Sequence, residues 1–229
     1  MGIFWFEDNL KGIAITGGEG PKSGTLKKLA EKADMIVAAD SGLDACEEAG
    51  IAPDWIVGDM DSLGDPRRLE KYPAERVIRH RSDKDYSDTE LALSLLWEKG
   101  CGEVWLAGGG GGRADHLLAI RALFERERAP DRWFTACEEI RRLKEGQTLS
   151  VNAATGGIVS VFPLGAGPWH TESSGLKWPL NGVAWQSGGF SLSNIAEETP
   201  FEIKSKKGSF LVIMKINNSH AEHAETQRN

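Results

Sequence analysis

The chain has 229 residues, 40% of them hydrophobic and 27% charged, which is enough to bury the core of one large domain or two small ones. Its formal net charge of −7 disfavours a nucleic-acid partner, because binding a polyanion normally requires a basic face. No run approaches the roughly 18 apolar residues of a membrane span, so we expect no membrane partner.

Two further features of the sequence concern its compartment. The segment Met1 to Asp8 has neither the basic region nor the long apolar region of a secretory signal. The three cysteines, Cys46, Cys101 and Cys137, are isolated and odd in number, which predicts neither a disulfide framework nor a paired zinc site. We therefore expect a cytoplasmic protein in a reducing compartment.

The first part of the chain alternates short apolar runs with helical patterns. The runs predict strands at 12–16, 35–39, 55–57, 77–79 and 104–107, and the periodic segments predict helices at 23–33, 43–49, 66–72, 87–99 and 115–128. This alternation is typical of βαβ units that form a parallel sheet with helices on both faces. Ligands of such sheets bind at the carboxyl ends of the strands.

From about residue 133 onward the helical period disappears. Short strands separated by Gly, Pro, Asn and Ser are predicted at 132–136, 139–143, 148–151, 158–163, 169–173, 189–193, 201–205 and 209–216. Many short strands with turn signals between them favour a small β-sandwich or barrel. A domain boundary is therefore expected near residues 130–146.

Acidic residues gather where the predicted strands of the first part end. They are Asp40, Asp59 and Asp61, Asp83, Asp85 and Asp88, and Asp115. Carboxylates at this density repel one another unless a positive charge lies between them, and Mg²⁺ prefers one or two carboxylates together with phosphate oxygens. The pattern indicates an enzyme that handles nucleotides.

Ordinary structural roles compete with a metal site at several of these positions. Asp40, Ser41 and Asp88, taken singly, are equally well explained as residues that cap helix N-termini. Asp59 and Asp61 favour a metal clamp, because their alternate spacing lets both carboxylates face one side of an extended segment.

Other residues beside the acids suit phosphate binding or local structure. Lys84 would neutralise a transferred phosphate, whereas Ser87 suits the cap of the following helix. The five glycines 108–112 lead to Arg113 and a helix start, which lets the backbone approach an anion. His116 by itself is more often a structural residue than a general base.

In their order along the chain, these segments resemble the motifs of the thiamine pyrophosphokinase family. The matching segments are Ala39-Asp40, Gly58-Asp59-Met60-Asp61-Ser62, Asp83-Lys84-Asp85-Tyr86-Ser87-Asp88, Gly111-Gly112-Arg113-Ala114-Asp115-His116, Gly175-Leu176-Lys177-Trp178-Pro179-Leu180 and Ser193-Asn194. The resemblance implies an N-terminal parallel-sheet α/β domain followed by a small all-β sandwich. It assigns an ATP-binding catalytic domain to residues 1–140, a thiamine-binding sandwich to 141–217 and a polar tail to 218–229.

The resemblance also implies an activity, which is Mg²⁺-dependent transfer of diphosphate from ATP to thiamine. The implied catalytic residues are Asp59, Asp61, Asp85, Asp88 and Asp115, of which Asp59, Asp61 and Asp88 would hold the metal. The implied ATP and phosphate contacts are Asp40, Lys84, Ser87, Gly111, Gly112, Arg113 and His116, and the implied thiamine contacts are Trp178, Ser193 and Asn194. Each site would lie between the two subunits of a homodimer.

Two departures from the family's pattern leave the acceptor open. Ser87 stands where the family more often has Thr, and Ala114 stands where a bulky aromatic residue is frequent. A pyrophosphokinase of the same fold acting on another heterocyclic alcohol, such as a pterin, is therefore one alternative. A protein that senses a nucleotide or thiamine diphosphate without turnover is the other.

Overall fold

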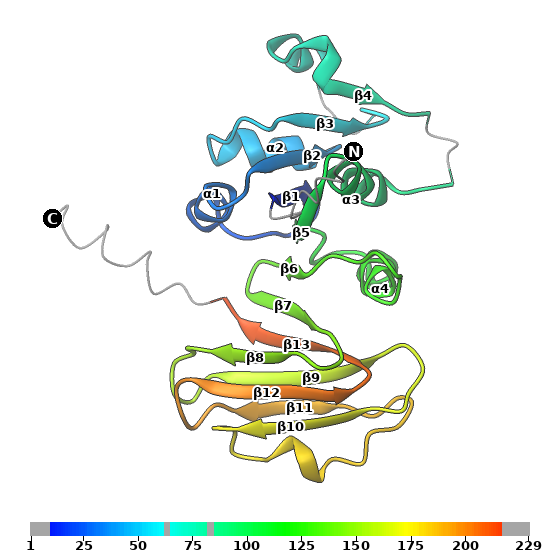
Figure 1. The fold of residues 1–229 in the computed structure, drawn as a ribbon. Coiled ribbons are helices and arrows are strands. Elements are labelled where there is room, and N and C mark those ends of the chain that lie inside the picture. Colours follow the sequence, from blue (N-terminus) through cyan, green and yellow to red (C-terminus); the bar gives the residue numbers. More distant parts are fainter. Residues whose placement is uncertain (1–9, 62–64, 82–84, 217–229) are drawn as a thin grey trace, which may run out of the picture. The chain divides into compact units, whose positions relative to one another are not determined.

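The computed structural model in Figure 1 describes residues 10–61, 65–81 and 85–216 of the chain. These residues form two compact units. The first runs to Ile120 and also includes Trp133–Ala136, whereas the second comprises Arg121–Arg132 and the chain from Cys137 onward. No helix among the described residues is both long enough and apolar enough to cross a membrane.

The first unit is built on a parallel sheet. Its strands are β1 (Leu10–Thr16), β2 (Met35–Ala39), β3 (Trp55–Gly58), β4 (Val77–Arg79), β5 (Cys101–Ala107) and β6 (Arg132–Phe134), in the order β6-β5-β1-β2-β3-β4. Strands β5, β1, β2, β3 and β4 pair in parallel. Ile13, Ala14 and Ile15 are buried in succession, as expected for a strand covered on both faces. The predicted parallel sheet is confirmed.

Helices cover both faces of this sheet. They are α1 (Ser23–Ala30), α2 (Gly42–Glu48), α3 (Asp88–Glu98) and α4 (Ala114–Leu123). Figure 1 shows α1 and α2 on one side of strands β1 to β3 and α3 on the other. Connections between parallel strands are right-handed, so the direction of each step along the sheet decides which face its helix covers. Helices α1 and α2 connect β1 to β2 and β2 to β3, which are steps in one direction, whereas α3 connects β4 to β5, which is a step in the opposite direction. The strand order therefore reverses between β1 and β5.

The predicted and observed helices differ most in two places. Residues Pro66–Lys71 form a 3₁₀ helix, η1, rather than an α-helix. Among its described side chains only Leu69 is buried, so an α-helix there would have no apolar stripe to pack. Helix α4 ends at Leu123 rather than at Arg128, and single turns of the i+3 type follow it. Short 3₁₀ turns also occur at Ala74–Arg76 (η2) and Leu180–Gly182 (η3).

The second unit is a β-sandwich. One layer has the antiparallel order β11-β9-β13-β7, formed by Ser191–Ile195, Ile158–Leu164, Ser209–Lys215 and Glu138–Leu143. The other has the antiparallel order β10-β12-β8, formed by His170–Ser174, Phe201–Lys207 and Thr148–Val151. Burial alternates along β12, where Phe201 and Ile203 join the core and Glu202 and Lys204 are exposed. This core, shared by strands of both layers, confirms the predicted sandwich.

Candidate active site

Three aspartates from different parts of the chain meet at the carboxyl edge of the parallel sheet. Asp40 follows β2, Asp59 follows β3 and Asp88 begins α3. One carboxylate oxygen from each lies within 4.8 Å of those from the other two, and all three residues are half-buried. We call these three residues the acidic cluster.

The backbone around Gly58 allows the acidic cluster to form. Asp40 adopts a left-handed conformation, with φ of 46°, and its N–H donates to the Val57 carbonyl at 2.9 Å. A Cβ on Gly58 would lie 3.2 Å from the Asp40 Cβ and 3.1 Å from Asp88 Oδ1. Both contacts are tighter than a Cβ normally makes, and the Gly58 φ of 152° is one that side chains rarely adopt, so glycine suits this position. Left-handed non-glycine residues such as Asp40 gather at functional sites in many proteins.

The position of Asp88 is set by the start of α3. The Ser87 hydroxyl accepts from the Glu90 N–H at 3.3 Å, and the Ser87 N–H donates to Glu90 Oε2 at 2.9 Å. This capping box confirms that Ser87 caps the helix. The next residue, Thr89, also contacts β1, because its hydroxyl lies 2.9 Å from that of Thr16.

Asp61 is not one of the three aspartates in the acidic cluster, although their negative charges affect its pKa. Its backbone N–H donates to Asp59 Oδ1 at 3.2 Å. The pKa of Asp61 is raised, first by a side-chain hydrogen bond with Asp59 and the negative charge of that residue, and then by the charges of Asp40 and Asp88. Negative charge that raises a neighbouring pKa in this way would be stabilised by a bound cation. Carboxylate oxygens alone are donors that suit a hard ion such as Mg²⁺.

The glycine run packs against the loop that follows β1. Gly109 donates to the Gly17 carbonyl at 2.7 Å, and Gly110 and Glu19 exchange two backbone hydrogen bonds of 2.7 and 2.9 Å. A Cβ on Gly111 would lie 2.3 Å from the Glu19 Cδ, whereas one on Gly112 would meet nothing within 4 Å. Close contact between two loops therefore explains most of the glycines that the sequence suggested for a ligand.

Arg113, Asp115 and His116 form a small polar group at the start of α4. The Arg113 guanidinium donates to both carboxylate oxygens of Asp115, at 3.1 and 2.6 Å. The hydrogen bond from Arg113 lowers the pKa of Asp115 to about 2, with help from the His116 N–H. A carboxylate with so low a pKa is a weak base, which favours a role for Asp115 in holding Arg113.

In the second unit, Asn194 holds the backbone of Trp178. The Asn194 side chain is 1% exposed, and it accepts from the Trp178 N–H at 3.2 Å and donates to the Trp178 carbonyl at 2.7 Å. Trp178 as a residue is 53% exposed, and Lys177 Nζ lies 4.9 Å from the centroid of its ring. Ser193 is left-handed, with φ of 57°, at an irregularity in β11. The Asn194 amide is therefore engaged by the protein, whereas the Trp178 ring is available to a ligand.

Two predicted residues remain, Lys84 and Asp85. Lys84 lies outside the described residues, and Asp85 is exposed and is not one of the acidic cluster. Sequence patterns missed Thr16 and Thr89, whose contact joins β1 to the start of α3. Thr16 is the last residue of β1, and the glycines that follow it were the sequence feature that could have drawn attention to this strand end.

A parallel α/β sheet that collects acidic side chains at its carboxyl edge is the arrangement of metal-dependent enzymes that act on phosphates. Two family models match the chain in this order: "Thiamin pyrophosphokinase, catalytic domain" over residues 26–131 and "Thiamin pyrophosphokinase, vitamin B1 binding domain" over residues 145–210. The acidic cluster lies in the first matched segment and Trp178 lies in the second.

Two relatives with the same family name also match the chain in sequence. The thiamine pyrophosphokinase of Bacillus subtilis is 29% identical over 180 residues, which are 75% of this chain and 83% of that relative. Thiamine pyrophosphokinase 2 of Arabidopsis thaliana is 27% identical over 168 residues, which are 67% of this chain and 62% of that relative.

Solved structures share the fold. The crystal structure of the Bacillus subtilis protein has a TM-score of 0.72 at 22% identity, covering 90% of this chain and 99% of that chain. The thiamin pyrophosphokinase from Candida albicans has a TM-score of 0.71 at 20% identity, covering 90% of each chain. The two family models together match well over half of the chain, which therefore belongs to the thiamine pyrophosphokinase family and is an enzyme.

Proposed function

We propose that this enzyme transfers the terminal diphosphate of ATP to the hydroxyethyl oxygen of thiamine, releasing thiamine diphosphate and AMP. The observation that carries the proposal is the acidic cluster of Asp40, Asp59 and Asp88 at the carboxyl edge of the sheet. The family relationship supports the choice of ATP and thiamine as substrates.

In this reaction the thiamine hydroxyl oxygen forms a bond to the β-phosphorus of ATP. The bond between the β-phosphorus and the oxygen bridging to the α-phosphorus breaks, and AMP leaves with that oxygen. The hydroxyl proton passes to a carboxylate or to water. Because the hydroxyl loses its proton late in a loose transition state, a strong base is not required. Asp85 and Asp88 remain the proposed acceptors, since the low pKa of Asp115 disfavours it.

The donor set of the acidic cluster fits Mg²⁺, with Asp40, Asp59 and Asp88 as the proposed ligands and Asp61 beside them. When bound, Mg²⁺ would supply positive charge to the phosphate oxygens on which negative charge develops. Arg113 is 72% exposed on its side chain, and we propose that it binds the phosphates while Asp115 orients it. Ser87, Gly111, Gly112, His116 and Lys84 keep their proposed phosphate roles.

For thiamine we propose stacking on Trp178. Thiamine is a cation with two flat rings, and an exposed indole face attracts such a cation. Lys177 lies near the same ring and would have to yield to the substrate. Ser193 is exposed and stays a proposed hydrogen-bonding partner, while Asn194 acts by holding Trp178.

We further propose a cytoplasmic homodimer in which each site combines the α/β unit of one subunit with the sandwich of the other. Large exposed apolar side chains in the sandwich, namely Ile158, Trp178, Phe190 and Leu192, support an interface there. The free cysteines support a reducing compartment. Mixing an Asp59→Asn subunit with a Trp178→Ala subunit should then restore activity, because one composite site would carry neither defect. No recovery despite subunit exchange would contradict the shared site.

The activity itself is tested by incubating the purified protein with Mg²⁺, ATP and thiamine. Thiamine diphosphate and AMP are expected in equal amounts. Release of ADP would contradict diphosphate transfer, and saturable binding without AMP would indicate a sensor. A panel of alcohols that includes a pterin tests the acceptor.

A further inference from the structure

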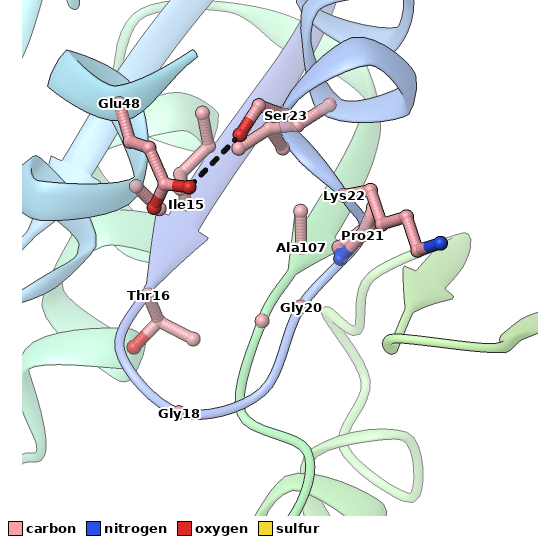
Figure 2. Close-up of a pocket in the computed structure, with 12 residues that line it drawn as sticks. Ile15, Thr16, Gly18, Gly20, Pro21, Lys22, Ser23, Glu48 and Ala107 are labelled. Atoms are coloured by element: carbon pink, nitrogen blue, oxygen red, sulfur yellow. Dashed lines mark hydrogen bonds between the residues drawn. The ribbon is translucent and has the colours of Figure 1, made fainter.

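Strand β1 contributes no carboxylate to the acidic cluster, yet its end contacts residues next to two of the cluster's aspartates. Figure 2 shows Thr16 at the tip of β1, where the following loop begins. The Thr16 hydroxyl lies 2.9 Å from that of Thr89, the residue after Asp88. A Cβ on Gly17 would lie 2.0 Å from the hydroxyl oxygen of Ser41, which follows another aspartate of the cluster. The end of β1 therefore packs closely on two segments that carry the candidate metal ligands.

Apolar packing holds α3 to the sheet from its second turn onward. Ala92, Leu93 and Leu96 are buried, and a Cβ on Gly12 of β1 would lie 2.7 Å from Leu96 Cδ2. In the first turn, residues 88–91 are only half-buried. Because helix ends fray, the position of this first turn depends on the polar contacts that reach it.

The capping box and the threonine pair hold the first turn in different ways. The capping box joins Ser87 to Glu90, two residues of the same segment, so it fixes the shape of the turn. Thr16 belongs to β1, so its contact with Thr89 joins the turn to the sheet. The threonine pair therefore sets how the turn lies on the sheet.

The setting of the first turn decides where Asp88 points. Asp88 and Thr89 are neighbours on the helix, so their side chains leave it about 100° apart. Thr89 reaches β1, whereas Asp88 reaches the end of β3, where a Cβ on Gly58 would lie 3.1 Å from Asp88 Oδ1. Strand β2 lies between these two strands. A rotation of the turn that separated Thr89 from Thr16 would also move the Asp88 carboxylate.

We propose that Thr16 and Thr89 are positioning residues that hold the Asp88 carboxylate where it binds the metal. The inference rests on the proposed function, since it concerns the metal of that reaction. Mg²⁺ requires nearly octahedral geometry with oxygens at roughly 2.0–2.1 Å, whereas Ca²⁺ tolerates longer and less regular distances. A small displacement of the carboxylate should therefore weaken Mg²⁺ binding more than Ca²⁺ binding.

The first test removes one hydroxyl and keeps a β-branched side chain. Thr89→Val should weaken Mg²⁺ binding in calorimetry about tenfold and Ca²⁺ binding less than about threefold. The Mg²⁺ concentration for half-maximal turnover should rise with the first value, while the KM for thiamine stays unchanged. Thr89→Ser keeps the hydroxyl and should bind Mg²⁺ as the unmodified protein does. Ser94→Ala, which removes an exposed hydroxyl from the same helix, is the matched control.

A second test asks whether the two hydroxyls act as one pair. The double variant of Thr16→Val and Thr89→Val should bind Mg²⁺ as weakly as either single variant, because removal of one hydroxyl already breaks the contact. Binding is measured without nucleotide, since Thr16 also lines the cavity drawn in Figure 2. Additive losses in the double variant would overturn the inference.

The outcomes separate this inference from the proposed function. In an active enzyme, unchanged Mg²⁺ binding by Thr89→Val would overturn the inference and leave the function intact, even if the melting temperature fell. Equal losses of Mg²⁺ and Ca²⁺ binding would also overturn it, because they would indicate a lost ligand rather than a shifted one. If the unmodified protein binds Mg²⁺ but lacks diphosphate transfer, weaker binding in Thr89→Val with recovery in Thr89→Ser would still support the positioning role.

Discussion

The two units position their candidate functional side chains by opposite means. In the α/β unit, Asp40, Asp59 and Asp88 are brought together by the ends of three separate elements, and their charges repel one another. In the sandwich, the Trp178 ring is exposed, and its backbone is held by the amide of the buried Asn194. The first arrangement opposes folding, whereas the second contributes to it.

This difference separates the effects of substitution. Removing a charge from the acidic cluster should impair the reaction and leave the fold as stable as before or more stable. Removing the buried amide of Asn194 should lower the free energy of unfolding and also weaken thiamine binding. Sites that bring like charges together need a bound cation to offset them, whereas sites held by buried hydrogen bonds are complete without a ligand.

The largest expected effect is on turnover in the α/β unit. Asp59→Asn should lower kcat by roughly 10²–10⁴-fold, because a lost metal contact removes several kcal/mol of transition-state stabilisation. Its melting temperature should stay the same or rise, since repulsion with Asp40 and Asp88 is relieved. Steady-state kinetics and calorimetry measure both. Glu70→Gln, an exposed carboxylate on η1, is the control. Ordinary turnover in Asp59→Asn would refute the metal site.

The next effect is on stability in the sandwich. Asn194→Ala leaves the Trp178 N–H and carbonyl and the Ile195 N–H without their side-chain partner. We expect the free energy of unfolding to fall by about 2–3 kcal/mol and the KM for thiamine to rise. Denaturant titration measures the first quantity, with exposed Asn181→Ala as the control. Weaker thiamine binding at unchanged stability would instead indicate that Asn194 contacts the substrate.

A smaller effect is expected at the exposed ring. Trp178→Ala should raise the KM for thiamine by about tenfold, which corresponds to the roughly 1–2 kcal/mol of a desolvated cation–aromatic contact. The KM for ATP and the melting temperature of this variant should change little, because Trp178 is 53% exposed. Leu10→Ala, at a position of β1 that is 45% exposed, is the control. If both variants bind thiamine equally well, stacking on Trp178 is wrong.

The smallest effect concerns the ion pair of Arg113 and Asp115. The pKa of Asp115 is about 2 instead of 3.8. Because the folded-state pKa is the lower one, the pair stabilises the fold fully above pH 3.8 and loses that contribution as the pH falls toward 2. Both groups are exposed, so the change in stability should be small. An NMR titration of the Asp115 carboxyl carbon should give the low midpoint in the unmodified enzyme and a near-normal one in Arg113→Ala.

Much of the fold followed from local pattern. The alternation of apolar runs and helical periods predicted strands β1 to β5 of the parallel sheet, apart from their exact limits, because burial on both faces requires continuous apolar strands. It did not predict β6, because the run at 132–136 was assigned to the sandwich. Turn residues between short runs predicted the sandwich. Helix type was predicted less well at Pro66–Lys71, where few apolar contacts are available to extend the first turn.

The sequence by itself determined that acidic residues follow strands whose carboxyl ends share one edge, and that Trp178 lies between two predicted strands of the second part. Only the tertiary structure decided that Asp40, rather than Asp61, joins Asp59 and Asp88. It also decided that the Asn194 amide faces the Trp178 backbone. Spacing along a chain shows which residues leave the same edge, but the direction of each side chain depends on loop dihedrals and on contacts across strands. The left-handed Asp40 and the missing Cβ of Gly58 are such features.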